Sequence, residues 1–493
     1  MIPTILAISG LAILYLYHVN RGMSEVPEEA RRLSPRRWTV DEIKAAFEDS
    51  IQNPVDVQKS LPPRQNRRYI VVGGSGLVGN WVVTHLLLRG ETPSAVRILD
   101  LQPPRRELLD QGVTFVQTNI TDEDAVLNAF SQPWAQETAS LPLTVIHNAA
   151  VIRPSERHPA FLSLCRNVNV TGTVHVLNAA KQSGASCFIS TSSGSVCLRS
   201  PSFWLFPWTR TPKHMVQVIN DSTSLPTKHE DFFGNYPVTK AEAERIVRAA
   251  DDPSSNFRTG CIRPANGIYG IGDDASATIT GTYLRAGGNP SWLYPIIQNF
   301  VNAENVSLAH LLYEQRLLEH AANPTSRPNC GGQAFVVTDP NPAISFADFY
   351  LLLCTLSKTP VAFPPVPAIP FLLLSYLVEW YALLQRIYLP WLLPPVSGDL
   401  AQMQPALFAI STVHVVVDDG RARRAPEEGG LGYNPPISTL YGLCKELGDW
   451  NRRHADRKSA AAVIAEKKLV GLSVETKCGV DVDVDVVVPP RKV

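Results

Sequence analysis

The stretch Tyr69-Ile-Val-Val-Gly-Gly-Ser-Gly-Leu-Val-Gly79 decides the fold. Its four apolar residues are typical of a buried strand, and a helical pattern follows over residues 77–89. A dinucleotide-binding turn needs glycine between strand and helix, because the turn is tight and the backbone must approach the pyrophosphate. The free N–H groups of the helix then face the phosphates. A glycine-rich turn without a ligand is the alternative. The residues predicted to bind the cofactor here are Gly73, Gly74, Ser75, Gly76, Leu77, Val78 and Gly79.

Further short apolar segments follow this turn and alternate with helical patterns such as residues 169–182. They lie at residues 96–99, 114–117, 145–147 and 187–190. Strands that alternate with helices are typical of a parallel sheet covered on both faces. The sequence therefore predicts an α/β fold with a Rossmann-type, doubly wound parallel sheet over residues 67–270. The alternation then loosens, which predicts a smaller C-terminal α/β substrate domain over residues 271–458.

Asp100 closes the second of these strands, about 20 residues after the glycines, as in dinucleotide-binding folds. A carboxylate at this point accepts hydrogen bonds from the ribose hydroxyls and repels a 2′-phosphate. It therefore favours NAD over NADP. Two alternatives stay open: NADP use, because Arg105 and Arg106 lie close by, and an aspartate that only caps a turn.

The segment Tyr236-Pro-Val-Thr-Lys240 places a phenol and an ammonium four residues apart. On a helix, these two side chains share a face and can address one site. We expect Lys240 to lower the pKa of the phenol, so that Tyr236 can act as general acid and base. The spacing alone proves little, and a structural tyrosine with a solvated lysine is the alternative.

A cluster of hydroxyls, Ser190-Thr-Ser-Ser193, follows a predicted strand. Side chains at the carboxyl end of a parallel strand project into the crevice where such sheets bind ligands. One hydroxyl can donate a hydrogen bond to a substrate oxygen while Tyr236 moves a proton. Serine and threonine are also common in turns, which is the alternative.

Four other segments complete a resemblance to a known family. They are His147-Asn-Ala-Ala150, Asn167-Val-Asn-Val-Thr-Gly-Thr173, Arg263-Pro-Ala-Asn-Gly-Ile-Tyr-Gly270 and Leu431-Gly-Tyr-Asn-Pro435. With the motifs above, the chain resembles the extended short-chain dehydrogenases over residues 67–455. Within them it is most similar to the 3β-hydroxysteroid dehydrogenases and sterol-4α-carboxylate 3-dehydrogenases.

The resemblance implies a role for each matching residue. Tyr236 would be the acid/base, Lys240 would orient the nicotinamide ribose, and Ser193 would be the catalytic serine, with Ser192 as the nearest alternative. Further cofactor contacts would come from Asn119, Ile120, Asn148, Ala149, Ala150 and Pro264. The cofactor would be NAD, with NADP as the alternative.

The implied reaction is oxidation of a 3β-hydroxyl group on a sterol, steroid or terpenoid, or the reverse reduction. Loss of a 4-carboxylate could accompany the oxidation. Two departures from the family pattern bear on this prediction: Asn119 replaces an aspartate, and Asn299-Phe-Val-Asn-Ala-Glu-Asn305 lacks the usual acid and aromatic residue. A sugar-nucleotide epimerase or dehydratase and a non-catalytic NAD(P) sensor are the alternative functions.

Two stretches are far more hydrophobic than the rest of the chain. Residues 1–20 predict an N-terminal membrane anchor, with a buried helix as the alternative, and residues 361–397 predict a membrane-associated segment. Between anchor and sheet, residues 21–66 predict a linker with one short helix after the capping box Thr39-Val-Asp-Glu42. Within residues 21–37, arginines outnumber glutamates, which predicts a catalytic domain on the cytosolic side of the endoplasmic reticulum membrane.

The composition limits the kinds of partner that we expect for this protein. Lys+Arg and Asp+Glu are equal at 45 each, which argues against nucleic acid binding. The 8 cysteines show no metal-ligand spacing, so we expect neither a metal site nor a disulfide framework. We expect a lipidic small-molecule substrate and contact with a membrane, and a homodimer stays open. The tail at residues 459–493 is predicted to be disordered.

The segment Ser202-Phe-Trp-Leu-Phe-Pro-Trp208 holds four aromatic residues between Ser193 and Tyr236. Ligand pockets are mostly hydrophobic, so one hypothesis is that these rings line a pocket or channel for a lipidic ring system. A loop that packs on the second domain is the alternative.

Overall fold

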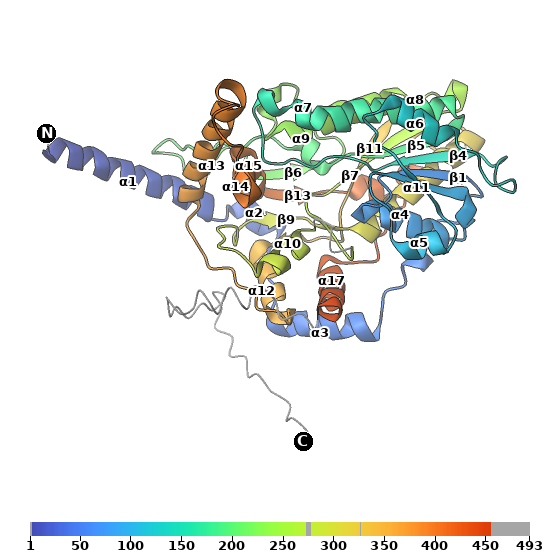
Figure 1. The fold of residues 1–493 in the computed structure, drawn as a ribbon. Coiled ribbons are helices and arrows are strands. Elements are labelled where there is room, and N and C mark those ends of the chain that lie inside the picture. Colours follow the sequence, from blue (N-terminus) through green and yellow to red (C-terminus); the bar gives the residue numbers. More distant parts are fainter. Residues whose placement is uncertain (1, 273–277, 326, 455–493) are drawn as a thin grey trace, which may run out of the picture.

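The computed structural model describes residues 2–272, 278–325 and 327–454. A seven-stranded sheet with the order β11-β7-β5-β4-β1-β2-β3 forms its centre (Figure 1). All neighbouring strands in this sheet are parallel. The strands are β1 (Arg68–Val72), β2 (Val96–Asp100), β3 (Thr114–Gln117), β4 (Leu143–His147), β5 (Ala185–Thr191), β7 (Arg258–Pro264) and β11 (Gln333–Val337).

The strand order reverses at β1, which pairs with β2 on one side and with β4 on the other. In doubly wound sheets, ligands bind outside the carboxyl ends of the strands at such a reversal. The predicted Rossmann-type fold is therefore confirmed, and the glycine-rich turn after β1 lies at the expected binding crevice.

Helices cover both faces of this sheet (Figure 1). α4 (Leu77–Leu88) packs with α11 (Ala303–Ala322), while α6 (Glu123–Ser131), α8 (Thr173–Gln182) and α9 (Asn235–Ala249) form the other layer. Along β1, the side chains alternate between the two layers. Tyr69 and Val71 belong to the same core cluster as Val82 of α4, whereas Ile70 and Val72 belong to the cluster of α6 and α8. Burial on both faces explains why β1 is apolar throughout rather than alternating.

A second, four-stranded sheet has the order β12-β9-β13-β6. Its strands are β6 (Val216–Ile219), β9 (Ile297–Gln298), β12 (Ile344–Ser345) and β13 (His414–Val417), and α12 (Phe346–Leu356) follows β12. Elements cross the boundary expected near residue 270. β6 pairs with β13 in the small sheet, and β11 completes the large sheet beside β7. Local sequence pattern does not reveal such exchanges, because strand partners are far apart in the chain.

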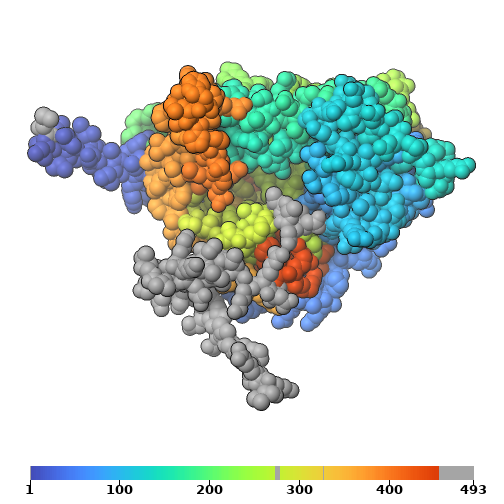
Figure 2. All heavy atoms as spheres, in the orientation of Figure 1, coloured from blue at the N-terminus to red at the C-terminus, as the bar shows by residue number. Residues whose placement is uncertain are grey.

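The N-terminal region consists of α1 (Ile2–Ser24), α2 (Glu28–Leu33) and α3 (Val40–Gln52). α3 begins at the predicted capping box, where Thr39 and Glu42 cap each other's backbone N–H groups. It packs against α12 and α17 (Thr439–Arg453), so the linker helix is docked on the body. α1 extends away from the body, and its first dozen residues are exposed (Figures 1 and 2).

The second hydrophobic stretch contains α13 (Ala368–Leu383) and the one-turn π-helix η8 (Leu384–Tyr388). α13 packs against α1 and α15 (Pro405–Ser411) and does not run parallel to α1 (Figure 1). By length and composition alone, residues 2–33 and 368–388 are helical segments that could cross a membrane. Of the cysteines, the seven that the structure describes are free, while Cys478 and the predicted disordered tail lie outside the described residues.

Candidate active site

The glycine-rich turn joins β1 to α4, and three of its glycines are required by the protein's own packing. A Cβ at Gly74 would lie 2.8 Å from Cγ2 of Ile98 and 3.0 Å from the carbonyl oxygen of Val71. Gly73 has a φ of +77°, and a Cβ there would lie 2.5 Å from the backbone nitrogen of Ala149. A Cβ at Gly79 would lie 2.1 Å from the carbonyl oxygen of Gly73. Gly76 is different, because a Cβ there would come no closer than 3.4 Å to another residue.

Gly76 is also the residue that caps the N-terminus of α4, and it has no side chain to occupy the free N–H groups of the helix. The absence of a Cβ therefore leaves room beside a helix N-terminus, where a phosphate group binds well. This cradle fits the pyrophosphate of a dinucleotide. The protein's own packing does not require a glycine at position 76, whereas room for a phosphate group explains one.

Asp100 lies at the end of β2, next to the same turn. Its Oδ2 accepts a hydrogen bond from the backbone N–H of Ser75 at 3.0 Å, and its Oδ1 accepts one from Leu101 at 2.7 Å. The two arginines that suggested NADP are engaged elsewhere. Arg105 donates to the carbonyl of Ile271 at 3.1 Å, and Arg106 pairs with Asp110 at 3.8 Å.

The end of β4 forms the other wall of the turn. The backbone N–H groups of Asn148 and Ala149 both donate to the carbonyl of Val72, at 2.8 and 3.0 Å. The Asn148 amide reaches the carbonyl of Gly73 at 3.4 Å, and Ala150 follows in a partly exposed position. The structure thus brings the predicted residues 148–150 together with the glycine-rich turn.

Asn119 and Ile120 follow β3 and differ in exposure. The Asn119 side chain is exposed and accepts hydrogen bonds from the backbone and hydroxyl of Thr121, at 3.1 and 2.9 Å. Ile120 is buried, and its side chain lies where a Cβ on Gly172 would be. In this structure the Asn119 side chain thus stabilises the turn in which it lies, and a contact between Asn119 and the cofactor stays a prediction.

Tyr236 is the second residue of α9, which begins after Gly234. Its side chain is partly exposed, and the Ser193 hydroxyl lies close to the phenol. Burial raises the pKa of Tyr236 to about 12, and the nearby Ser193 hydroxyl acts in the opposite direction. The structure therefore brings together the phenol and the hydroxyl that the sequence assigned to one site.

Lys240 lies one turn further along α9 and is buried. Its Nζ donates to the carbonyl of Thr191 at 2.5 Å, and burial lowers the pKa of the ammonium to about 8. The expectation that Lys240 lowers the pKa of Tyr236 is wrong for this structure. The ammonium bonds to the end of β5, and the group that lowers the phenol pKa is the Ser193 hydroxyl.

The structure also separates the two candidate serines. Ser192 donates to Oε2 of Glu244 at 2.6 Å, and Glu244 forms a buried, two-pronged ion pair with Arg263 at 2.6 and 2.8 Å. Ser192 is therefore held by a structural network. The Ser193 hydroxyl lies 2.8 Å from that of Ser195 and is near the phenol of Tyr236. Of the two serines, Ser193 therefore agrees better with the predicted catalytic role.

Sequence reasoning missed Glu244 and the partner role of Arg263. Glu244 continues the helix face of Tyr236 and Lys240 by one more turn, and that i, i+4 spacing was a usable signal. Arg263 comes directly before Pro264, which ends β7. The Pro264 carbonyl lies 2.9 Å from where a Cβ on Gly194 would be, so the predicted cofactor residue Pro264 lies beside the Ser193 turn.

The outward rings of the aromatic segment lie at the surface, and a pocket or channel lined by them stays a prediction. Trp204, Phe206 and Trp208 are 40, 64 and 78% exposed. Trp204 stacks between Tyr15 of α1 and Tyr376 of α13, with ring centroids 6.4 and 6.2 Å away. The loop thus contacts both hydrophobic stretches of the chain, which the sequence did not show.

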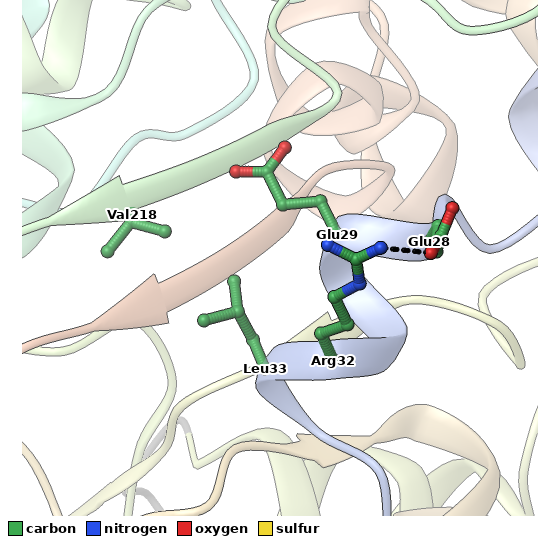
Figure 3. A pocket seen from close by; sticks show the side chains of 5 residues that line it. All are labelled: Glu28, Glu29, Arg32, Leu33 and Val218. Atoms are coloured by element: carbon green, nitrogen blue, oxygen red, sulfur yellow. Dashed lines mark hydrogen bonds and ion pairs between the residues drawn. The ribbon is translucent and has the colours of Figure 1, made fainter.

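One open surface pocket lies elsewhere, between α2 and β6 (Figure 3). Its lining residues are Glu28, Glu29, Arg32, Leu33 and Val218. An ion pair between Arg32 and Glu28 crosses its rim. Tyr236, Lys240 and Ser193 are not among the lining residues, so we assign this pocket no part in the chemistry.

Comparison with known proteins decides the family. The chain matches the 3-beta hydroxysteroid dehydrogenase/isomerase family over residues 70–359. It belongs to that family. The resemblance found in the sequence is thereby confirmed, and the protein is an NAD(P)-dependent oxidoreductase that acts on CH–OH groups, as the glycine-rich turn and the Ser193–Tyr236–Lys240 site also indicate.

Individual relatives agree with this assignment. The chain is 29% identical over 383 residues to mouse (Mus musculus) 3 beta-hydroxysteroid dehydrogenase type 7, covering 75% of this chain and 92% of the relative. It is 30% identical over 303 residues to human (Homo sapiens) sterol-4-alpha-carboxylate 3-dehydrogenase, decarboxylating, covering 60 and 68%. Among solved structures, UDP-glucose-4-epimerase from Stenotrophomonas maltophila aligns with a TM-score of 0.52 and 16% identity over 79% of this chain and 99% of its own. At that identity the epimerase supports the fold alone.

Proposed function

We propose that this enzyme oxidises the 3β-hydroxyl group of a sterol, steroid or terpenoid, or catalyses the reverse reduction, with NAD as the preferred cofactor. The observation that carries the proposal is the placement of the Ser193 hydroxyl beside the phenol of Tyr236, one helical turn from the buried Lys240. Family membership supports the 3β-hydroxyl group as the reacting group. The mouse relative is a 3 beta-hydroxysteroid dehydrogenase by name.

Each catalytic side chain has one task in this proposal. Ser193 donates a hydrogen bond to the substrate oxygen, and Tyr236 in its ionised form takes the proton from the hydroxyl group as it becomes a ketone. Because burial raises the pKa of Tyr236 to about 12, this role needs a positive charge near the phenol, which the oxidised nicotinamide would supply when bound. Lys240 donates a hydrogen bond to the carbonyl of Thr191 at the end of β5, and its proposed role is to orient the nicotinamide ribose. When bound, NAD(P) supplies the acceptor for the hydride.

The preference for NAD rests on the surroundings of Asp100. Its carboxylate lies at the glycine-rich turn, where it would repel a 2′-phosphate. Arg105 and Arg106, the side chains that could attract such a phosphate, are bonded to Ile271 and Asp110. The preference for NAD therefore rests on the carboxylate of Asp100, and Arg105 and Arg106 keep their positive charge nearby.

Decarboxylation is the finer part of the proposal. The human relative is named as a decarboxylating sterol-4-alpha-carboxylate 3-dehydrogenase. Oxidation of a 3-hydroxyl group beside a 4-carboxylate gives a β-keto acid, which can lose carbon dioxide without a further catalytic group. The same Ser193–Tyr236–Lys240 site would then suffice for both steps.

The proposed location is the endoplasmic reticulum membrane, with α1 as the anchor and the catalytic body in the cytosol. The exposed, apolar first half of α1 supports the anchor. The arginine surplus after it supports the cytosolic side, because positive residues flank the cytosolic end of membrane helices. A lipidic substrate would then be available in the same membrane.

The test uses microsomes that contain the full chain and follows NADH or NADPH formation. They are offered 3β-hydroxysterols with and without a 4-carboxyl group, with each cofactor in turn, and Tyr236→Phe serves as the control. We expect turnover with NAD that the substitution abolishes. Turnover that survives Tyr236→Phe, or none with any 3β-hydroxysterol despite cofactor binding, would overturn the proposal.

A further inference from the structure

The loop 202–208 carries apolar side chains on both of its faces. Phe203 and Leu205 point inward and are 5 and 6% exposed, while Trp204, Phe206 and Trp208 point outward. Inward apolar residues are ordinary core. Three large outward rings in one loop are not, because water is a poor solvent for them. They indicate that something other than water covers this surface.

The loop is held firmly in this orientation. The Phe203 ring packs edge-on against Phe408 with centroids 5.2 Å apart. Leu205 fills the space beside Gly22 of α1, where a Cβ would lie 2.5 Å from its Cδ1. The ring of His18 bonds to the carbonyl of Phe206 at 3.2 Å. The outward rings are thus built into the fold.

The exposed surface continues onto the second hydrophobic stretch. Trp204 donates its indole N–H to the hydroxyl of Tyr376 on α13, at 3.3 Å. The outward ridge of α13 and the turn after it is mainly apolar, and its exposed charge, Arg386, donates to the carbonyl of Ala160 at 3.0 Å. Its apolar members that are at least 40% exposed are Leu373, Leu377, Trp380, Ile387, Tyr388, Trp391 and Leu392. Loop 202–208, α13 and the C-terminal half of α1 are far apart in sequence but contact one another, and α1 lies beside α13 in Figures 1 and 2.

The charge of α13 is kept away from this ridge. Glu379, the charged residue of the helix, is 12% exposed and forms a two-pronged ion pair with Arg157 at 2.7 and 2.8 Å. Arg157 also lies over the ring of Tyr376, 5.3 Å from its centre. The polar side of α13 thus faces the body, and its apolar side is left outside.

We propose that the outward rings of loop 202–208 and the apolar ridge of α13 form one docking surface for the headgroup region of the bilayer in which α1 is anchored. The surface is continuous with α1 through Tyr15 and His18, so anchoring α1 brings it against the lipid. Tryptophan and tyrosine favour the membrane–water boundary, because one part of each ring system is apolar and the other can hydrogen-bond. The proposal rests on the anchoring of α1 and is independent of the sterol substrate.

The test uses the full chain in vesicles of phosphatidylcholine with or without bromine on the acyl chains near the headgroup. The emission of Trp208 is obtained as the difference between the wild-type protein and Trp208→Phe. We expect bromolipid to remove about half of this emission, and we expect acrylamide in the water to have little effect, because an interfacial ring contacts acyl chains. Trp134, which packs under Arg97 away from this surface, serves as the control through Trp134→Phe.

Three results are distinguishable. Flotation of the protein with vesicles tests the anchor first, and a protein that does not float refutes the proposed anchoring. A protein that floats but whose Trp208 emission is quenched by acrylamide and not by bromolipid refutes the docking surface alone. Trp208 emission that neither agent quenches, together with a dimer by sedimentation in detergent, shows that a second copy covers the surface and also refutes it.

Discussion

Two regions depart in opposite ways from the usual pattern of buried apolar and exposed polar side chains. They are the site around Tyr236 and Lys240, called here the catalytic corner, and the surface beside α1. At the corner, Lys240, Glu244 and Arg263 are buried polar groups, and each has a bonded partner. At the surface, Phe206 and Trp208 are exposed apolar groups without a protein covering. Buried charges cost free energy unless they are paired, and exposed rings cost free energy unless something covers them. The paired charges therefore belong to the framework that holds Ser193 and Tyr236 in place, whereas the exposed rings belong to the surface that we propose docks on the membrane.

The largest expected effect is at the corner. Tyr236→Phe removes the acid/base and keeps the ring, so we expect kcat to fall by about 10³-fold while NAD binding is retained. Steady-state kinetics and cofactor titration measure the two quantities. Tyr388→Phe, on an exposed residue of η8, is the matched control and should leave kcat unchanged. An equal loss of kcat in Tyr236→Phe and Tyr388→Phe would mean that the catalytic corner is no more important for turnover than the surface.

The second effect is a pH dependence of stability from Lys240. Its pKa is about 8 in the folded protein, below the ordinary 10.5, so the unfolded chain binds more protons between these values. Stability therefore rises with pH in that window, by about 3 kcal/mol at most. Thermal unfolding of the detergent-solubilised wild-type protein and of Lys240→Met should show a difference in stability that grows from pH 8 to 10.5. A constant difference would mean that Lys240 is not desolvated.

The third effect separates two neighbouring hydroxyls. Ser193→Ala should lower kcat by about 10²-fold with little change in Tm, because it removes a donor to the substrate oxygen. Ser192→Ala should instead lower stability by about 1 kcal/mol, because it removes a bond to the buried Glu244, and it should largely preserve kcat. A loss of kcat in Ser192→Ala together with a preserved kcat in Ser193→Ala would identify Ser192 as the catalytic serine.

The smallest effect is at the surface. Phe206→Ser with Trp208→Ser should raise KM for a sterol supplied in vesicles by about threefold and leave kcat unchanged, because α1 still holds the protein on the membrane. Ile51→Ser replaces an apolar residue of α3 that is 62% exposed and serves as the matched control. An equal change in KM for both variants would mean that exposed apolar residues in general, and not this surface, matter.

Most of the nucleotide-binding half could be predicted from the sequence. β3 has the bounds that were expected, and β1, β2 and β4 exceed theirs by one or two residues. These predictions succeeded because a strand buried on both faces is a local apolar run, and because a glycine-rich turn between strand and helix is a local backbone requirement. The helix that carries Tyr236 and Lys240 was predicted for the same reason, since i, i+4 spacing is a property of one segment.

The tertiary structure decided what depends on partners from distant segments. The sequence could not choose between Ser192 and Ser193, because the choice rests on Glu244, more than fifty residues away. It could not show that Lys240 bonds to Thr191, or that β11 and β6 cross the expected boundary. It also could not show that packing of the loop against Gly22 and Phe408 leaves Trp204, Phe206 and Trp208 outward. Sequence alone determined which residues could do chemistry, since that follows from side-chain type and local spacing. Only the folded chain decided which of them meet, since burial and hydrogen-bond partners are set by the whole structure.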